Sequence, residues 1–188
     1  MAPQALVLSD SGLGDVRVGA PLPARLLEPA SDPQGRYIQG FHADAQTHDG
    51  FSLPGLPVRI LMEGSGPFTR WFDDPKRKDD PPPSAAVRLS LAKVAVQEAR
   101  DGAKVGWIVV DGAGVRTSAG IGVGSLYQDV QRAYPSARLA AQPPTFGRDS
   151  CVMILSPMQR VQAFFNDCRA ARAGGTVTRL VVMPPEKK

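Results

Sequence analysis

The sequence contains no long hydrophobic run, few aromatic residues and only two cysteines. Aromatic side chains make up 6% of the 188 residues, and the longest stretch without a charged side chain spans 12 residues, from Thr117 to Gln128. A membrane-spanning helix needs about 18 consecutive apolar residues, so we expect no transmembrane segment. The hydrophobic fraction of 43% and the charged fraction of 21% are typical of a globular chain with a packed core.

Sequence signatures of enzymes and nucleic-acid-binding proteins are also missing. The chain has no Gly-x-Ser-x-Gly nucleophile motif, no Walker A motif and no carboxylate pair typical of an acid–base dyad. The net charge is +4, and the excess of arginine lies in residues 125–188. These arginines are spaced singly, without a Lys/Arg run or interleaved aromatic residues, which argues against nucleic-acid binding. The sequence therefore favours a protein with no catalytic residues and no bound cofactor.

Glycine and proline, in contrast, are abundant, with 19 and 18 residues. This composition predicts many turns and short helices. Two glycine-rich segments resemble each other, Gly12-Leu-Gly-Asp-Val-Arg-Val-Gly and Gly120-Ile-Gly-Val-Gly. Their recurrence about a hundred residues apart predicts a duplicated unit. We place the first unit in residues 1–112, with a long loop at 64–83, and the second in residues 113–188.

Each glycine-rich segment is expected to lead into a short helix. After the second copy, Ser125 and Gln128 form a Ser-x-x-Gln capping box, which predicts a helix over 126–134. After the first copy, Pro21 or Pro23 opens a shorter helix. The glycines depart from the dinucleotide-binding fingerprint at its third position, so we interpret them as tight turns rather than as a cofactor site.

Short apolar runs predict antiparallel strands between these helices. They cover residues 37–41, 58–62, 87–96 and 105–110 in the first unit, and 152–155, 161–165 and 177–183 in the second. The stretch 86–97 alternates in part, as a half-solvated strand does, although its alanine, lysine and glutamine content also allows a helix. The highly charged segment 70–80 is expected to be a loop. The pattern predicts an α+β fold, a duplicated unit in which a short helix packs on an antiparallel β-sheet.

The two cysteines, Cys151 and Cys168, flank a predicted hairpin. If Leu155 pairs with Phe164, the same register brings the cysteines together and allows a cross-strand disulfide. The alternative is two buried thiols in a cytosolic protein, because disulfides persist in oxidising compartments. The first residues lack the basic and apolar character of a signal peptide, so we expect either a cytosolic protein or a mature chain whose leader was removed. The disulfide favours the second.

Two histidines and a carboxylate lie close together in the sequence at His42, Asp44 and His48. They could supply a two-His, one-carboxylate metal site. The spacing of the histidines matches none of the common zinc motifs, and a polar hairpin tip explains the segment equally simply. An alternative function based on these residues is a small metal-dependent hydrolase with a metal-bound water as nucleophile.

Three aromatic residues, Phe68, Trp71 and Phe72, stand among charges in the loop 64–83. Aromatic residues together with arginine are the usual hot spots of protein interfaces, so these three are candidates for partner binding. The alternative interpretation is a local cluster that holds a long loop against the core.

The segment from Trp107 to Tyr134, with Thr117-Ser-Ala-Gly-Ile-Gly-Val-Gly at its centre, resembles bacterial cell-envelope proteins and lipoproteins of uncharacterised function. The upstream Ser11-Gly-Leu-Gly-Asp-Val-Arg-Val-Gly is similar to their N-terminal half, and the downstream cysteine pair is similar to that of sigma-E-regulated envelope lipoproteins. The Val-Gly-helix element is also similar to the outer-membrane assembly lipoprotein and beta-lactamase-inhibitor fold, in which a helical pair packs on an antiparallel sheet. The resemblance implies a periplasmic location in a Gram-negative bacterium and no catalytic residue. The sequence has no lipobox cysteine and so gives no support for lipid attachment.

The favoured function is accordingly a non-catalytic periplasmic or cell-envelope protein. Its expected partner is an envelope protein or a cell-wall component. Binding is expected through the sheet face or through the loop 64–83.

Overall fold

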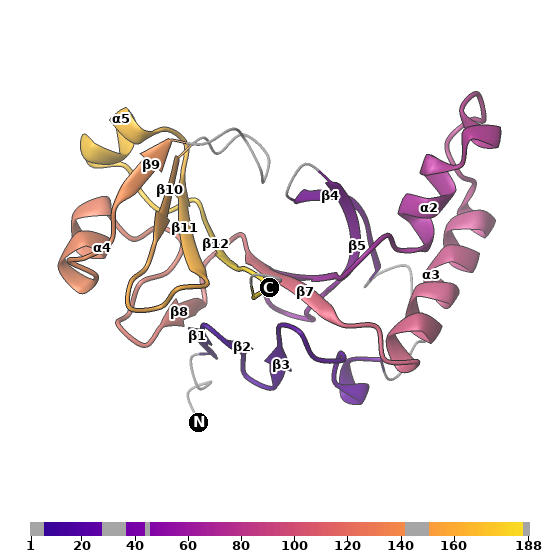
Figure 1. Cartoon of the computed structure of the whole chain (residues 1–188), viewed down its shortest axis with the longest axis horizontal. Helices are drawn as coiled ribbons and strands as arrows, with labels where there is room; N and C mark the ends of the chain where they lie inside the picture. Colours follow the sequence, from indigo (N-terminus) through magenta and orange to yellow (C-terminus); the bar gives the residue numbers. More distant parts are fainter. Residues whose placement is uncertain (1–5, 28–36, 44–45, 142–150, 186–188) are drawn as a thin grey trace.

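The computed structural model describes residues 6–27, 37–43, 46–141 and 151–185, with the backbone alone in 37–43 and 46–47. Two β-sheets and several short helices make up the described part (Figure 1). The neighbouring strands of the large sheet all run antiparallel. The α+β class predicted from the sequence is therefore confirmed.

The large sheet has eight strands in the order β4-β5-β6-β7-β12-β11-β10-β9. This order runs inward from both edges, so that β7 from the middle of the chain and β12 from its end are neighbours at the centre. The strands are β4 (Tyr37–Ala43), β5 (Gln46–Ser52), β6 (Val58–Met62), β7 (Val105–Val110), β9 (Leu139–Ala141), β10 (Cys151–Ile154), β11 (Val161–Phe165) and β12 (Arg179–Val182).

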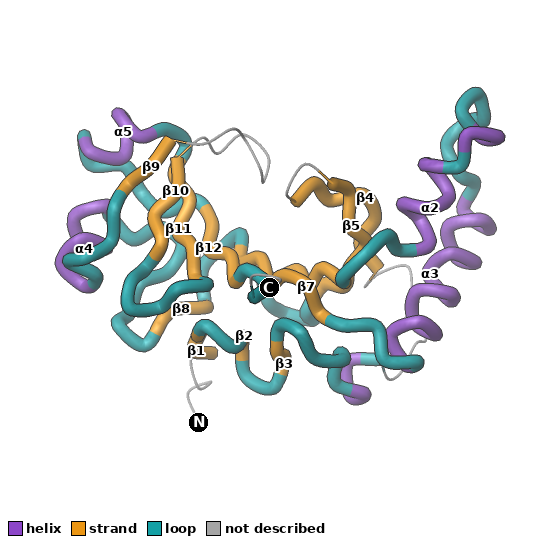
Figure 2. Tube along the Cα trace, viewed as in Figure 1, coloured by secondary structure: helices purple, strands orange, loops and turns teal. Residues whose placement is uncertain are grey.

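The helices and a small sheet lie on one side of this large, curved sheet. Figures 1 and 2 show α2 and α3 at one end, α4 and α5 at the other, and the small sheet, of order β3-β2-β1-β8, between them. The small sheet consists of β1 (Leu6–Ser9), β2 (Gly12–Leu13), β3 (Val16–Arg17) and β8 (Val115–Thr117), and the helices are η1 (Ala24–Leu26), α2 (Pro67–Asp73), η2 (Pro75–Arg77), α3 (Ala85–Arg100), α4 (Tyr127–Ala133) and α5 (Cys168–Arg172).

The central strand β7 is buried on both faces. Ile108 and Val110 belong to the main apolar core, together with Ala95 of α3 and Val130 of α4. Because successive residues of a strand project to opposite faces, Trp107 lies on the other side of the sheet. A second, smaller apolar cluster covers that face and consists of Leu61, Trp107, Val109, Val152, Phe164 and Val181.

The two glycine-rich segments make the same backbone hydrogen bonds. The amide of Gly19 donates to the carbonyl of Val105 at 2.7 Å, and the amide of Val105 donates to Ala20 at 2.8 Å. Gly124 and Val177 repeat the first bond at 2.8 Å. Both glycines have φ values in the left-handed region, +83° and +88°, which explains why glycine is used in each copy. The equivalence supports a repeated unit, while the proposed boundaries 1–112 and 113–188 stay a prediction.

The strand expected at 87–96 is wrong, because this segment lies within the 16-residue helix α3. Ser84 caps the helix, since its hydroxyl accepts a hydrogen bond from the amide of Val87 at 3.4 Å. The buried residues Ala92, Ala95, Val96 and Ala99 recur at helical spacing and face the core. Packing of this alanine-rich stripe against the sheet outweighs the partial alternation of the sequence.

Three further local expectations need correction. The long loop expected at 64–83, with its charged segment 70–80, is not only loop, because it contains α2 and η2. The helix expected at 126–134 is α4, but the hydroxyl of Ser125 accepts from the amide of Gly122 at 3.0 Å and thereby closes the glycine turn instead of capping the helix. In the first copy, the described residues up to Leu27 form one 3₁₀ turn, η1, where a short helix was expected.

The disulfide between Cys151 and Cys168 is present, with a Cα–Cα distance of 5.1 Å. The hairpin register proposed for it is wrong, because Cys151 pairs with Phe165 and Val152 with Phe164. Cys168 is the first residue of α5, and Asp167 caps that helix by accepting from the amide of Ala170 at 2.7 Å. The disulfide therefore joins strand β10 to the first residue of α5, and not two paired strands as expected.

A charged cluster joins strands from the two halves of the chain. The carboxylate of Asp111 accepts from Nε of Arg59 on β6 at 2.7 Å and from Nε of Arg179 on β12 at 2.6 Å. Burial lowers the pKa of Arg59, whereas the charge of Asp111 acts in the opposite direction. Asp111 thus neutralises one of two partly desolvated guanidinium groups.

We expect Asp111→Ala to lower the free energy of unfolding by about 2 kcal/mol, because two half-buried arginines lose their shared acceptor. Urea denaturation measures this change. The control is Asp129→Ala, which removes an exposed ion pair with Arg132 at 3.0 Å and should cost less than about 0.5 kcal/mol. Equal losses in the two variants would contradict a structural role for the cluster.

Candidate functional site

A buried carboxylate holds the N-terminus of α2. Asp49 on β5 is 2% exposed and accepts hydrogen bonds from the amides of Phe68 at 2.7 Å and Thr69 at 3.2 Å, and from the Thr69 hydroxyl at 2.7 Å. The first amides of a helix have no partner within it, and the N-cap residue here is Gly66, which has no side chain to offer. A Cβ at Gly66 would overlap the Asp49 side chain. Asp49 therefore supplies the missing cap from a neighbouring strand.

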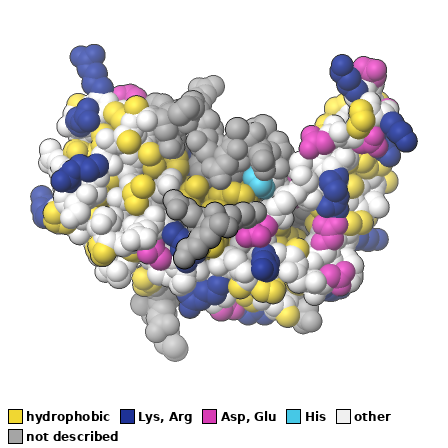
Figure 3. Space-filling model, in the orientation of Figure 1, with side chains coloured by type: hydrophobic (Ala, Val, Ile, Leu, Met, Phe, Trp, Pro, Cys, Tyr) yellow, Lys and Arg dark blue, Asp and Glu magenta, His cyan; other side chains and the backbone are white. Residues whose placement is uncertain are grey.

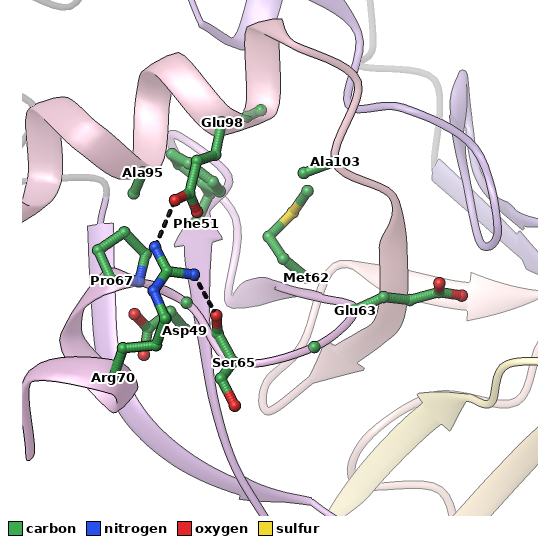
Figure 4. Close-up of a pocket in the computed structure, with 13 residues that line it drawn as sticks. Asp49, Phe51, Met62, Glu63, Ser65, Pro67, Arg70, Ala95, Glu98 and Ala103 are labelled. Carbon is green, nitrogen blue, oxygen red and sulfur yellow. Dashed lines mark hydrogen bonds and ion pairs between the residues drawn. The ribbon is translucent and has the colours of Figure 1, made fainter. Parts of the chain in front are cut away.

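A cavity of about 130 Å³ lies where α2 and α3 meet the sheet (Figure 4). Arg70 of α2 donates to the carbonyl oxygen of Ser65 at 2.5 Å and forms an ion pair with Glu98 of α3. Phe51 and Met62 contribute apolar surface to the cavity. Figure 4 shows that Arg70 lies between Ser65 and Glu98. These two contacts of Arg70 thus connect α2 to α3 and to Ser65, which precedes α2 in the chain.

We use the name α2 ridge for residues 67–77, which contain α2 and η2. Phe68 is 7% exposed and belongs to the main core, whereas Phe72 is 50% exposed and Trp71 is half-buried. The ring centroids of Phe68 and Phe72 are 4.6 Å apart, and those of Trp71 and Phe72 are 4.9 Å apart, both with the rings edge to face. This is a preferred geometry of aromatic pairs. The three rings form a continuous path from the core to the surface.

Arg77 completes the exposed part of the α2 ridge. Its guanidinium carbon lies 5.2 Å from the centroid of the Trp71 ring, within the range of a cation–π contact. Ion pairs to Asp74 at 3.7 Å and Asp80 at 3.5 Å surround it. In Figure 3, basic and acidic side chains are intermixed on the projecting end of the molecule. The α2 ridge therefore exposes aromatic rings and an arginine side chain, with acidic and basic side chains around them.

The structure brings the three expected aromatic residues together but gives them different surroundings. Phe68 is part of the core, as the alternative interpretation of this cluster has it. Phe72 faces solvent, and the ring of Trp71 is shared between Phe72 and Arg77. A role of these residues in partner binding stays a prediction.

The expected metal ligands are only partly described. His48 is 2% exposed, and its ring lies 4.2 Å from that of Trp107. The backbone of His42 pairs with Thr47, whereas His48 pairs with Phe41, so the two histidines belong to successive cross-strand pairs. The side chain of His42 and all of Asp44 lie outside the described residues. Within the described part of the chain, no group of three His, Cys, Asp or Glu residues could hold a metal ion.

Sequence reasoning missed Asp49, Arg70 and Glu98 as the residues that position the α2 ridge. One local signal of this helix was available. Pro67 directly follows Gly66, and proline at the first helical position is typical of a helix start. The capping bonds join residues 19 and 20 positions apart, and the Arg70–Glu98 pair spans 28 positions. Helix and strand periodicities relate residues only a few positions apart, so they do not reveal contacts between residues this distant in the sequence.

Comparison with known proteins identifies the fold. No family model matches the chain, and no curated protein matches it either. The structure is similar to the crystal structure of the uncharacterized protein yfeY from Escherichia coli, with a TM-score of 0.51 and 12% sequence identity. The similarity covers 94% of this chain and 99% of that chain. At this identity the likeness concerns the fold alone. Among the described helices, none is long and apolar enough to cross a membrane.

Proposed function

We propose that this protein is a non-catalytic cell-envelope protein that binds a protein or cell-wall partner through the α2 ridge. The observation that carries the proposal is Phe72, which is 50% exposed although its ring packs against Trp71 and Phe68. Aromatic residues and arginine dominate interface hot spots, and both occur here on one projecting element.

The attachment of the ridge supports the same function. Asp49 orders the first turn of α2, and Arg70 links α2 to Glu98 of α3. A surface that is already ordered loses little conformational entropy when a partner binds. The exposed rings are thus presented in a fixed geometry.

The disulfide supports an extracytoplasmic location. Cys151 and Cys168 are bonded, and structural disulfides persist in oxidising compartments such as the periplasm. The resemblance of the glycine-rich segments to envelope proteins points to the same compartment.

Site-specific photo-crosslinking tests the proposed surface. We expect a benzophenone amino acid at position 72 to cross-link a single species in a Gram-negative envelope extract. The same probe at Val94 of α3, which is 43% exposed, should yield none. Adding Trp71→Ala should abolish the cross-link, while the free energy of unfolding falls by about 1 kcal/mol because Trp71 is only half-buried.

Two results would refute this surface. Equal cross-linking from positions 72 and 94 would show nonspecific contact. A cross-link that survives Trp71→Ala would show that the paired rings do not recognise the partner.

A further inference from the structure

The end of the molecule that carries α4 and α5 is basic. Residues 125–141 and 166–176 contain four arginines, two aspartates and no other charged side chain, which gives a net charge of +2. All four arginines are exposed. Figure 3 shows basic side chains over α4 and α5, with few acidic ones among them. We call this surface the arginine face, and its arginines are Arg132, Arg138, Arg169 and Arg172.

Both aspartates of the arginine face already have partners. Asp129 forms an ion pair with Arg132 at 3.0 Å, and Asp167 caps α5 by accepting from the amide of Ala170. Within the described part of the chain, the other three arginines form no ion pair. Residues 67–80 at the opposite end of the molecule differ, because four basic and four acidic side chains balance there. The arginine face therefore carries positive charge that is available to an external anion.

Bonds between its elements hold the arginine face together. The disulfide joins Cys168 of α5 to Cys151 of β10, and Cys151 pairs with Ala141 of β9. The amide of Tyr127 at the start of α4 donates to the carbonyl oxygen of Gly175, just beyond α5, at 3.0 Å. The elements that carry the arginines are thus fixed relative to one another.

The side chains and their layout indicate the kind of anion. Arginine has a planar guanidinium group that can donate two hydrogen bonds to one phosphate group. The four arginines come from two helices and from the segment before β9, so they cover a broad surface instead of lining one pocket. Leu126, which precedes α4, is 44% exposed and adds an apolar side chain to this surface. Arginines beside an exposed leucine suit the boundary of a bilayer, where lipid head groups lie above hydrocarbon.

We propose that the arginine face binds the surface of a membrane that contains anionic phospholipid. The arginines contact lipid phosphates, and Leu126 enters the boundary between head groups and acyl chains. Because α2 lies at the opposite end of the molecule (Figure 1), this orientation leaves the α2 ridge accessible to a partner. The inference relies on the proposed cell-envelope location, which brings membranes within reach, but not on the partner of the α2 ridge.

Sedimentation with phospholipid vesicles tests the proposal. We expect at least about tenfold tighter binding to phosphatidylcholine vesicles with ~30% phosphatidylglycerol than to phosphatidylcholine alone, since each arginine near an anionic surface gains about fivefold. Sodium chloride at ~0.5 M should release the protein, because exposed charges are screened. The assay contains no envelope protein, so a negative result refutes this inference without bearing on the α2 ridge.

Paired charge substitutions locate the binding surface. The double variant Arg169→Gln, Arg172→Gln should weaken vesicle binding about twentyfold. The control Lys93→Gln, Arg100→Gln removes the same charge from two exposed residues of α3 and should have little effect. Asp129→Asn should instead strengthen binding about fivefold, because it removes a negative charge from the arginine face. Urea denaturation of each variant confirms that it is folded.

Brominated phospholipid, which quenches tryptophan fluorescence at close range, reports the orientation of the bound protein. Leu126→Trp should add fluorescence that the bound vesicles quench. Phe72→Trp, at an exposed position of the α2 ridge, should add fluorescence that they do not quench.

Several results would overturn the proposal. Absence of binding to the anionic vesicles, or equal binding to phosphatidylcholine alone, would show that anionic lipid is not recognised. Equal losses in the α3 and α5 double variants would show that only the net charge of the protein matters. Quenching at position 72 instead of 126 would place the α2 ridge on the membrane. Tighter binding of polyglutamate or of a DNA duplex than of the vesicles would assign the arginine face to a soluble polyanion.

Discussion

Replacing Asp49 by alanine should lower the free energy of unfolding by about 3 kcal/mol. The carboxylate is buried and accepts hydrogen bonds from two backbone amides and one hydroxyl at the start of α2. Hydrogen bonds to a charged group contribute about 1.5–3 kcal/mol each, and buried donors without an acceptor are costly. Partial access of water to the opened site keeps the total well below the sum of three such bonds.

The loss should be concentrated at α2. We expect amide hydrogen exchange to speed up in residues 67–73 of the Asp49→Ala variant, with little change in β7 at the centre of the sheet. Asp49→Asn keeps the shape and one acceptor oxygen, so its cost should be intermediate. Urea denaturation gives the global change, and hydrogen exchange gives its location.

Asp74 provides a matched control on the same ridge. Its carboxylate caps η2 by accepting from the amide of Lys76 at 3.0 Å, but this bond is exposed. Asp74→Ala should therefore cost about 0.5–1 kcal/mol. If Asp49→Ala costs no more than Asp74→Ala, the buried cap does not stabilise the ridge as argued.

Removing the disulfide should lower the free energy of unfolding by about 3 kcal/mol, the chain-entropy contribution of a loop of this length. The bonded residues are 17 positions apart in the sequence. Alanine suits the double variant Cys151→Ala, Cys168→Ala, because Cys151 is fully buried and serine would bury a hydroxyl there. Urea denaturation with and without dithiothreitol measures the effect.

The reductant supplies an internal control. Dithiothreitol should shift the urea midpoint of the wild-type protein by about as much as the double substitution, and should leave the variant unchanged. Denatured, unreduced protein prepared from an oxidising compartment should contain no free thiol. Two free thiols in that sample would contradict both the bond and the proposed extracytoplasmic location.

The most accurate sequence predictions are the strands near the centre of the large sheet. The bounds of β6, β7 and β11 agree with the apolar runs at 58–62, 105–110 and 161–165. Such strands are buried on both faces, so the runs are almost continuous and their ends are marked by polar residues or turns. Local composition is sufficient in these cases.

The helix α3 shows where local composition is insufficient. Its sequence permits both a partly alternating strand and a helix, and the choice depends on the alanines that pack against the core. The hairpin of β10 and β11 is similar, because both strands were expected but the register proposed for them from the sequence was wrong. A register depends on which face of each strand is buried, which is a property of the assembled sheet.

The candidate site could be predicted only as a set of residue types. The aromatic residues of the α2 ridge and the bonded cysteines are visible in the sequence, because side-chain chemistry is local. Their positions depend on Asp49, Glu98 and the start of α5, which come from other parts of the chain.

The sequence by itself determined the α+β class, the central strands and the glycine turns, and it left the two cysteines open between a disulfide and two free thiols. The features that it determined follow from short-range preferences of the sequence. Tertiary structure alone decided the helix at 85–100, the hairpin register and the cap of α2 by Asp49. These features arise from contacts between segments distant in the chain, whose free energy exists only once the sheet has brought the segments together.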